Sequence, residues 1–310
     1  MKLEKMIPTF LEDFEQKSKM VKNYVSLNTL KAYKLNLDMF HRYLIENNKG
    51  TSLNVINERD IVQFINNLIE QGKSPSTRNQ IVSTLKSLHR FARKKYKLQN
   101  NPFIEIQSAY QKRKEAKYIS DEDYEYLLAE IDKKGGIDQI IFRVLLQSGI
   151  RASELIGLNN NDVVFENGHM IIKIMNGKGN KSRELPFVVT NEDGTENKEN
   201  LKLRNLLKTL INSNKKETPN EKALFVSNFK KRLSYQGLNA KYKRWMKKLK
   251  LAEKNYTLHS CRHTMVRRLQ KKGVGLHIIQ AICGHSDPTV TQRVYGTHVT
   301  VEDIAKENKF

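Results

Sequence analysis

Apolar side chains recur at intervals of three and four residues through the first hundred positions of the chain. This spacing places them on one face of a helix, whereas the alternation of β-branched residues that marks strands is scarce. The pattern predicts helices at about residues 9–21, 28–47 and 58–71. The apolar stripe of the second helix consists of Leu30, Tyr33, Leu37, Phe40 and Leu44. The sequence therefore begins with a small all-helical domain.

A fourth helix gives the clearest signal in this region. Ser74 is placed to cap its N-terminus, and Pro75 suits the first helical position. The basic residues of this helix fall mostly away from its apolar stripe, so we expect them to face outward. The stripe consists of Ile81, Leu85, Leu88 and Phe91.

The chain changes character after this helix. Asn101-Pro102 ends the helical pattern, and QKRKEAK, which has no apolar periodicity, separates it from the next helix. We therefore expect a helical domain over residues 1–104, a linker over 105–117 and a second domain over 118–310. The second domain opens with helices predicted at about 121–133 and 138–148.

Alternation replaces the helical spacing near Asp162. DVVFENGHMIIKIM alternates around Asn167-Gly168, a strong hairpin signal, and SRELPFVV follows a glycine-rich turn at 177–180. A three-stranded antiparallel meander is predicted, followed by a helix at about 199–212 and then by further helices. The predicted fold class is mainly α with a small antiparallel β-meander, an all-helical N-terminal domain preceding a mixed α/β C-terminal domain.

The charge of the chain indicates a class of partner. The 310 residues include 55 Lys and Arg against 33 Asp and Glu, a formal net charge of +22. Residues 1–114 hold 21 bases and 10 acids, and residues 115–310 hold 34 and 23, so each part carries +11. A protein this basic favours a polyanionic partner. The even division predicts that both domains contact the same nucleic acid.

Two stretches are denser in bases than the rest of the chain. One is SLHRFARKKYK in the fourth predicted helix, within a region that has no acid between Glu70 and Glu105. The other runs from Lys230 to Lys254 and holds ten bases and one acid. A single run is as often a solvated helix face as a binding surface, but two runs in separate domains favour DNA binding. The candidate DNA-binding residues are Lys86, Arg90, Arg93, Lys94, Arg244 and Lys247.

Cysteine usage and the N-terminus indicate the compartment. The two cysteines, Cys261 and Cys283, form neither a disulfide framework nor a CxxC metal motif. The N-terminal stretch has no apolar signal region, and nowhere do 18 apolar residues run together. We expect a cytoplasmic, nucleoid-associated protein without a membrane partner.

Five short patterns in the second domain could carry chemistry: QSGIRASELIGL, NGKGNKSR, LHSCRHT, CGHSD and TQRVYGTH. Each alone is weak, because a lone arginine, turn lysine or tyrosine usually has a structural role. In this order and spacing, the set resembles the tyrosine recombinases, the phage integrase and Xer-like group, over essentially the whole chain. NTLKAYKLNLDMFHRYL and SPSTRNQIVSTLKSLHRFARKK resemble that family's core-binding, SAM-like domain. Because the chain begins with these helices, no arm-binding domain is expected in front of them.

The resemblance implies a catalytic set of six residues that uses no cofactor and no metal. It implies that Tyr295 attacks a scissile phosphate and forms a covalent 3′-phosphotyrosine intermediate. The other five residues would assemble around that phosphate, namely Arg151, Lys178, His259, Arg262 and His285. The implied activity is site-specific DNA recombination, either of the Xer type or as integration and excision of a mobile element.

The resemblance also implies partners. These are double-stranded DNA with a specific recombination site and further copies of the chain, forming a homotetramer on two DNA sites. The last helix, VTVEDIAKENKF, would dock on a neighbouring protomer, although a frayed terminal helix is equally compatible with its sequence. The resemblance leaves open whether an accessory protein or a partner recombinase takes part.

The chemistry of these residue types fits those roles. Two arginines offer planar, permanently charged forks to phosphate oxygens on which negative charge develops. Glu154, one helical turn after the first arginine, is placed to orient it. Tyr295 must lose its proton during attack, and His259 is a plausible acceptor near neutral pH. Lys178, in a glycine-flanked turn, is the expected general acid for the leaving 5′-oxygen, with Lys181 as its closest rival.

Other interpretations fit less well. His259 and His263 are spaced as in a zinc helix, but Ser260 stands where the general-base glutamate is needed. GKGNKS differs from a P-loop, because no Ser or Thr follows GK and the turn joins two strands. A type IB topoisomerase shares the chemistry, and a non-catalytic DNA-binding regulator explains the charge but needs no set of six. These two stay open as alternatives.

Overall fold

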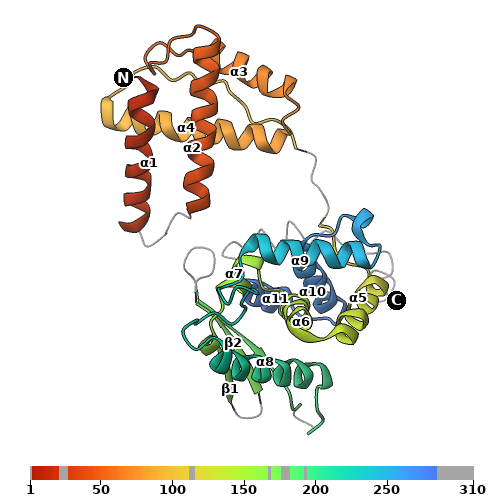
Figure 1. The fold of residues 1–310 in the computed structure, drawn as a ribbon. Coiled ribbons are helices and arrows are strands. Elements are labelled where there is room, and N and C mark those ends of the chain that lie inside the picture. The colour runs from red at the N-terminus through yellow and green to blue at the C-terminus, as the bar shows by residue number, and fades with distance from the viewer. Residues whose placement is uncertain are drawn as a thin grey trace. The chain divides into compact units, whose positions relative to one another are not determined.

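The computed structural model describes residues 2–20, 27–111, 116–166, 169–175, 182–191 and 194–284 (Figure 1). The chain divides into two compact units, residues 1–114 and 115–310. The predicted fold class is confirmed, since the structure is mainly helical with one three-stranded antiparallel sheet in the described residues. No helix in these described ranges is long and apolar enough to cross a membrane.

The regular elements in the described part of the N-terminal unit are four helices. Its helices are α1 (Leu3–Met20), α2 (Leu27–Glu46), α3 (Glu58–Glu70) and α4 (Pro75–Tyr96). Helix α4 contacts both α1 and α2 and crosses them (Figure 1). The Ser74 hydroxyl accepts the backbone N–H of Thr77, and Lys97 ends α4 in the left-handed conformation. The predicted stripe of α4 is buried in the core of this unit.

Helix α1 begins at Leu3 and not near residue 9 as the pattern predicts. Pro8 lies inside the helix, where it lacks an N–H and removes one backbone hydrogen bond. The chain tolerates this loss because four apolar side chains of the first turns are buried in the core, Leu3, Met6, Ile7 and Phe10. The backbone N–H of Leu3 also donates to the carbonyl of Thr51, 2.9 Å away.

The C-terminal unit is built around α6, which is almost entirely buried and contacts α5, α7, α8 and α10. Glycines 135 and 136, both with positive φ, allow α6 to follow α5 directly. In chain order the described elements are α5 (Asp121–Lys134), α6 (Gly136–Ser148), α7 (Ala152–Gly157), η1 (Asn160–Asp162), β1 (Val163–Glu166), β2 (His169–Ile174), β3 (Arg183–Phe187), α8 (Lys198–Glu217), α9 (Tyr235–Lys248), η2 (Ala252–Lys254), α10 (Leu258–Lys271) and α11 (Leu276–Cys283).

The three strands form the predicted meander, in the order β1-β2-β3. Burial alternates along β2, which turns Met170, Ile172 and Ile174 into the main core of the unit. Ile174, the last residue of β2, pairs with Arg183, the first residue of β3. The two predicted turns, at 167–168 and 177–180, lie outside the described residues.

Both cysteines are buried free thiols. Cys261 lies on α10 within the main core, whereas Cys283 ends α11 in a smaller cluster with Met265, Val266 and Ile279. Burial raises the pKa of the Cys261 thiol to about 12 and also raises that of Cys283.

Candidate active site and basic surfaces

Arg151 lies where α6 gives way to α7. Helix α6 ends at Gly149, which has a φ of 61°, and Arg151 then occupies the N-cap of α7. Glu154 lies in the first turn of α7, and its carboxylate accepts both the backbone N–H of Arg151 (2.9 Å) and its Nη1 (2.7 Å). The Glu154 side chain is only 2% exposed, while that of Arg151 is 21% exposed. Glu154 therefore fixes Arg151 and leaves part of its guanidinium accessible.

A second arginine, Arg183 of β3, binds the same carboxylate. Its Nη1 and Nη2 donate to the two Glu154 oxygens at 3.0 and 2.7 Å, and its Nε donates to the carbonyl of Ile282 at 2.8 Å. Burial of Glu154 would by itself raise the carboxyl pKa. The hydrogen bonds and charges of Arg183 and Arg151 outweigh that effect and lower it to about 2.

Arg262, on α10, completes the group. It is 1% exposed, and its Nη1 and Nη2 donate to the carbonyls of Gly149 (2.7 Å) and Cys283 (2.6 Å). Burial lowers the pKa of this guanidinium, but an arginine stays charged near neutral pH. We call Arg151, Arg183 and Arg262, together with Glu154, the arginine cluster.

The three guanidinium groups converge on one helix end. The carbonyls of Ile282, Cys283 and Gly284, three consecutive residues at the C-terminal end of α11, accept from Arg183, Arg262 and Arg151. A helix C-terminus carries partial negative charge, which these cations offset. The described residues supply one carboxylate to three guanidinium groups, so the arginine cluster keeps a positive charge that suits an anion.

His259 lies in the first turn of α10, close enough to Arg262 and Arg151 for their charges to act on it. Burial, followed by the charges of these two arginines, lowers the pKa of His259 below 6.5. The ring of His263 stands edge-on to it, with the centroids 4.5 Å apart. A neutral imidazole beside the arginine cluster can accept a proton near neutral pH.

The structure thus brings together the predicted residues Arg151, Glu154, His259 and Arg262. The other predicted members of the catalytic set, Lys178, His285 and Tyr295, lie outside the described residues, as does Lys181. Sequence reasoning missed Arg183, although it belongs to the NGKGNKSR pattern. The one available signal was its position at the start of the third predicted strand.

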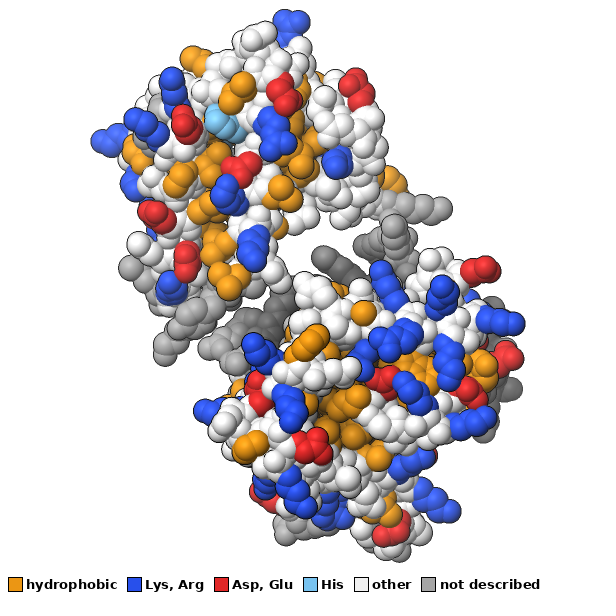
Figure 2. Space-filling view, in the orientation of Figure 1, with side chains coloured by type: hydrophobic (Ala, Val, Ile, Leu, Met, Phe, Trp, Pro, Cys, Tyr) orange, Lys and Arg blue, Asp and Glu red, His pale blue; other side chains and the backbone are white. Residues whose placement is uncertain are grey.

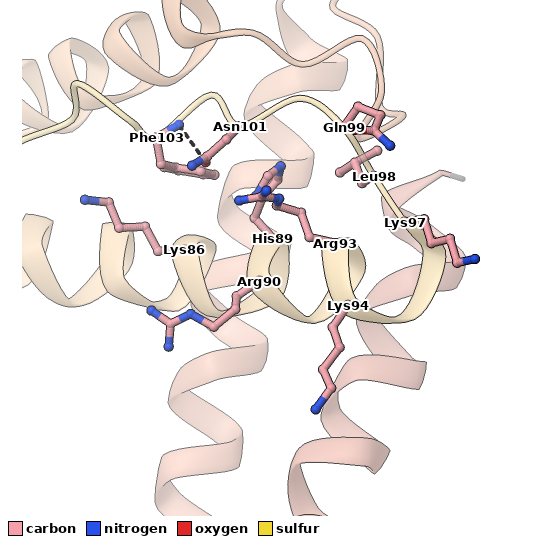
Figure 3. Close-up of a pocket in the computed structure, with 10 residues that line it drawn as sticks. All are labelled: Lys86, His89, Arg90, Arg93, Lys94, Lys97, Leu98, Gln99, Asn101 and Phe103. Carbon is pink, nitrogen blue, oxygen red and sulfur yellow. Dashed lines mark hydrogen bonds between the residues drawn. The ribbon is translucent and has the colours of Figure 1, made fainter.

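The N-terminal unit presents a separate basic surface on α4. A cavity of about 660 Å³ lies beside this helix, and the described residues that line it include no acid (Figure 3). His89 and Phe103 are among the residues that line it, and they pack edge-on with ring centroids 5.5 Å apart. Figure 3 shows Arg90 and Lys94 extending from the side of α4 opposite the segment that leads to Phe103. We call the four predicted DNA-binding residues that line the cavity the α4 basic surface: Lys86, Arg90, Arg93 and Lys94.

Helix α9 carries the other basic run. Two of its lysines serve the fold, because Lys241 pairs with Asp138 at 2.8 Å and Lys248 lies 4.7 Å from the ring centre of Trp245. Arg244 and Lys247 are exposed, and no described residue forms an ion pair with either. Figure 2 shows Lys and Arg side chains gathered over this part of the C-terminal unit.

Comparisons with family models cover both units. The model of the phage integrase family matches residues 117–302. The model of the phage integrase N-terminal SAM-like domain matches residues 11–95.

Curated relatives match along nearly their whole length. The tyrosine recombinase XerD of Oceanobacillus iheyensis is 30% identical over 302 residues, which covers 95% of both chains. The tyrosine recombinase XerC of Thermodesulfovibrio yellowstonii is 30% identical over 283 residues, covering 90% of this chain and 88% of the relative.

Solved structures share the fold. The XerH site-specific recombinase bound to a palindromic difH substrate, in a post-cleavage complex, has a TM-score of 0.73 at 21% identity, covering 96% of this chain and 83% of that one. The Tn1549 transposon integrase in complex with circular intermediate DNA has a TM-score of 0.68 at 22% identity and covers 99% of both chains.

Proposed function

The chain belongs to the phage integrase family and is a site-specific tyrosine recombinase, and from that premise we propose how its own residues cleave and rejoin DNA. The observation that carries the proposal is the arginine cluster, a preorganised and positively charged site beside a neutral His259. Phosphoryl transfer depends on such positioning and on stabilisation of the charge that develops on the phosphate.

Cleavage begins when the Tyr295 hydroxyl oxygen attacks the scissile phosphorus. A phosphorus–oxygen bond forms to the tyrosine, and the bond to the 5′-oxygen of the next nucleotide breaks. The tyrosine proton passes to His259, whose lowered pKa keeps it neutral and able to accept. The leaving 5′-oxygen takes a proton from Lys178, with Lys181 as the alternative donor.

The remaining residues hold the phosphate. Arg151 and Arg262 stabilise the non-bridging oxygens through fixed guanidinium groups, and neither metal nor ATP takes part. Glu154 orients Arg151 through two hydrogen bonds. His285 donates a hydrogen bond to a phosphate oxygen.

Rejoining uses the same groups in reverse. The tyrosyl 3′-phosphate keeps the energy of the broken phosphodiester, so a 5′-hydroxyl from another strand attacks it and releases Tyr295. Exchange between two duplexes follows when that hydroxyl belongs to the partner site.

DNA is held by both domains, residues 1–104 and 118–310, with 105–117 as the linker. The α4 basic surface and the exposed Arg244 and Lys247 contact phosphates of a specific recombination site. The active species is a homotetramer on two sites, in the cytoplasm at the nucleoid. The C-terminal segment VTVEDIAKENKF, which lies outside the described residues, docks on a neighbouring protomer. The similarity to Xer recombinases along the whole chain supports Xer-type recombination with a partner recombinase, and that to the Tn1549 integrase supports integration and excision as the alternative.

The test compares wild-type and Tyr295→Phe protein on sheared host DNA that carries random nicks, in the presence of EDTA. After denaturation, DNA that stays attached to protein is sequenced. Wild type should yield covalent adducts at one recurring sequence and Tyr295→Phe should yield none. Adducts with Tyr295→Phe would overturn the role of this tyrosine.

The same experiment separates the alternatives. Adducts from wild type without joint molecules between two duplexes would indicate a type IB topoisomerase activity. Binding without adducts from either protein would indicate a DNA-binding regulator.

A further inference from the structure

Arg183 holds the arginine cluster together, although it is not among the six residues of the catalytic set. It is the first residue of β3, and its side chain is 11% exposed. All three of its guanidinium nitrogens donate to protein groups, two of them to the Glu154 carboxylate and the third to the carbonyl of Ile282. Arg183 therefore joins three elements that are distant in sequence, namely α7, β3 and α11.

Glu154 depends on Arg183 for half of its hydrogen bonds. Each carboxylate oxygen accepts once from Arg151 and once from Arg183. A buried carboxylate left with fewer donors is costly, because no solvent replaces the lost hydrogen bonds. Without Arg183, Glu154 would lose its bidentate partner, and the carboxylate that fixes the Arg151 guanidinium would be held less firmly.

The contact with α11 is equally close. Gly284 has a φ of 62°, and a Cβ at this position would lie 2.9 Å from Nη1 of Arg183. The backbone thus passes directly over the Arg183 guanidinium at the point where α11 ends. Arg183 sets the position of the chain immediately before residue 285.

We propose that Arg183 is a positioning residue for DNA cleavage, which aligns Arg151 through Glu154 and fixes the end of α11 through Ile282. This inference rests on the proposed function. The role assigned to Arg183 is to hold other groups in place, because its guanidinium binds both oxygens of Glu154 and the carbonyl of Ile282. A displacement of about 1 Å in a catalytic group can slow a reaction about 100-fold.

The first experiment uses the full-length protein and a nicked duplex that carries the sequence recovered from wild-type adducts. Arg183→Met should lower the single-turnover cleavage rate about 100-fold while the DNA dissociation constant changes less than about threefold. Arg183→Lys should lose at least about tenfold, because one ammonium cannot reach both Glu154 oxygens and the Ile282 carbonyl.

Arg143 provides the matched control. It is 1% exposed and binds two carboxylates, Asp132 and Glu199, without contacting the arginine cluster. Arg143→Met should lower the melting temperature but leave the cleavage rate of the folded protein near that of wild type. Rates are compared at a temperature where circular dichroism shows each variant folded.

A double-mutant cycle tests the route through Glu154. The loss caused by Arg183→Lys should be several-fold smaller in a Glu154→Gln background than in the wild-type background. Equal losses in the two backgrounds would show that Arg183 does not act through Glu154 and would overturn the proposal.

The pH profile gives a readout that folding alone would not move. The groups that face Glu154 are Arg151 from α7, Arg183 from β3, Arg262 from α10 and Cys283 from α11. Removing Arg183 raises the pKa of Glu154, so the acid limb of the cleavage rate should shift to higher pH in Arg183→Met and not in Arg143→Met.

The outcomes are distinguishable. Absence of adducts from wild type would refute the proposed function, and this inference with it. Wild-type adducts together with an unchanged rate in Arg183→Lys would refute the inference alone. Weakened DNA binding at an unchanged saturating rate would make Arg183 a DNA contact and would also overturn the positioning role.

Discussion

The α4 basic surface and the arginine cluster both contain arginine side chains, but these lie in opposite environments. On α4, Arg90, Arg93 and Lys94 are exposed, and no described acid lines the cavity beside them. In the arginine cluster, Arg183 and Arg262 are buried or nearly so, and carbonyls and one carboxylate fix their positions. Exposed bases supply screened, long-range attraction to phosphates, whereas fixed guanidinium groups supply geometry. The bases behind the net charge of +22 thus occupy two different environments, and we propose that these serve two functions, attraction of DNA and alignment of the phosphate.

The largest difference between the two regions should appear in the free energy of unfolding when the pH is lowered. The pKa of Glu154 is lowered from 4.5 to about 2, so its stabilising effect is complete above pH 4.5 and is lost as the pH falls toward 2. The shift corresponds to about 3 kcal/mol of unfolding free energy, of which about 2 kcal/mol should be lost between pH 5 and 3. Urea unfolding at both pH values measures this loss.

Glu154→Gln is the control for that titration. This variant should lose about 2 kcal/mol less than wild type between pH 5 and 3, because it has no carboxyl to protonate there. Other acids with lowered pKa, such as Asp132 and Asp138, titrate in both proteins and cancel in the difference. Equal losses of unfolding free energy in the two proteins would show that protonation of Glu154 does not destabilise the fold. The arginine cluster would then contribute no more to stability than the α4 basic surface.

The second prediction keeps the positive charge of a side chain and removes the planar guanidinium geometry. Arg151→Lys should slow single-turnover cleavage at least tenfold, and by about 100-fold if both aligned donors are needed, with DNA affinity nearly unchanged. The matched variant is Arg90→Lys on α4, which should alter neither quantity by more than about twofold. Quenched-flow cleavage and a binding titration would measure both, and equal effects at the two positions would remove the distinction between the regions.

The third prediction removes the surface charge. Replacing Arg90, Arg93 and Lys94 with Gln should weaken DNA binding more than tenfold at about 0.1 M salt. The slope of log K against log salt should fall by about 3, because each lost phosphate contact contributes about 0.9. The cleavage rate at saturating protein should stay unchanged, and a slower rate would show that α4 also positions the reacting strand.

The smallest expected effect concerns Gly149, whose carbonyl accepts a hydrogen bond from Arg262. Gly149→Ala forces a side chain into the left-handed region and places a Cβ 2.0 Å from Cε of Met265, which must move. The free energy of unfolding should fall by about 1–2 kcal/mol. At Gly157 the added Cβ would meet no described atom within 4 Å beyond its chain neighbours and its own helix backbone. Gly157→Ala should therefore change the free energy of unfolding by no more than about 0.5 kcal/mol, and calorimetry would measure both variants.

Local signals made much of the fold predictable. Helix α4 follows from Ser74, Pro75 and a stripe of apolar side chains within the helix itself, and the structure confirms it. The predicted start of α1 was wrong, because Pro8 disfavours a helix when only the local sequence is considered. Its first turn is held instead by burial and by the backbone of Thr51, which is distant in sequence.

The candidate site divides in the same way. The resemblance placed Arg151, His259 and Arg262 in one catalytic set, and the structure brings them together. Arg183 was not predicted because its partners, Glu154 and Ile282, lie 29 and 99 residues away in the sequence. Contacts at such separations do not affect the local pattern of apolar and polar residues. The roles of Lys178, His285 and Tyr295 stay predictions.

The two buried thiols make the protein its own unfolding probe. The thiolate is the form that attacks thiol reagents, and burial both raises the pKa of Cys261 and Cys283 and shields them from solvent. Labelling therefore requires local opening, and its rate reports how often the core around each cysteine opens. Cys261 reports on the main core and Cys283 on the smaller cluster at the end of α11, so mass spectrometry of the two labelled peptides would time the openings of each region separately.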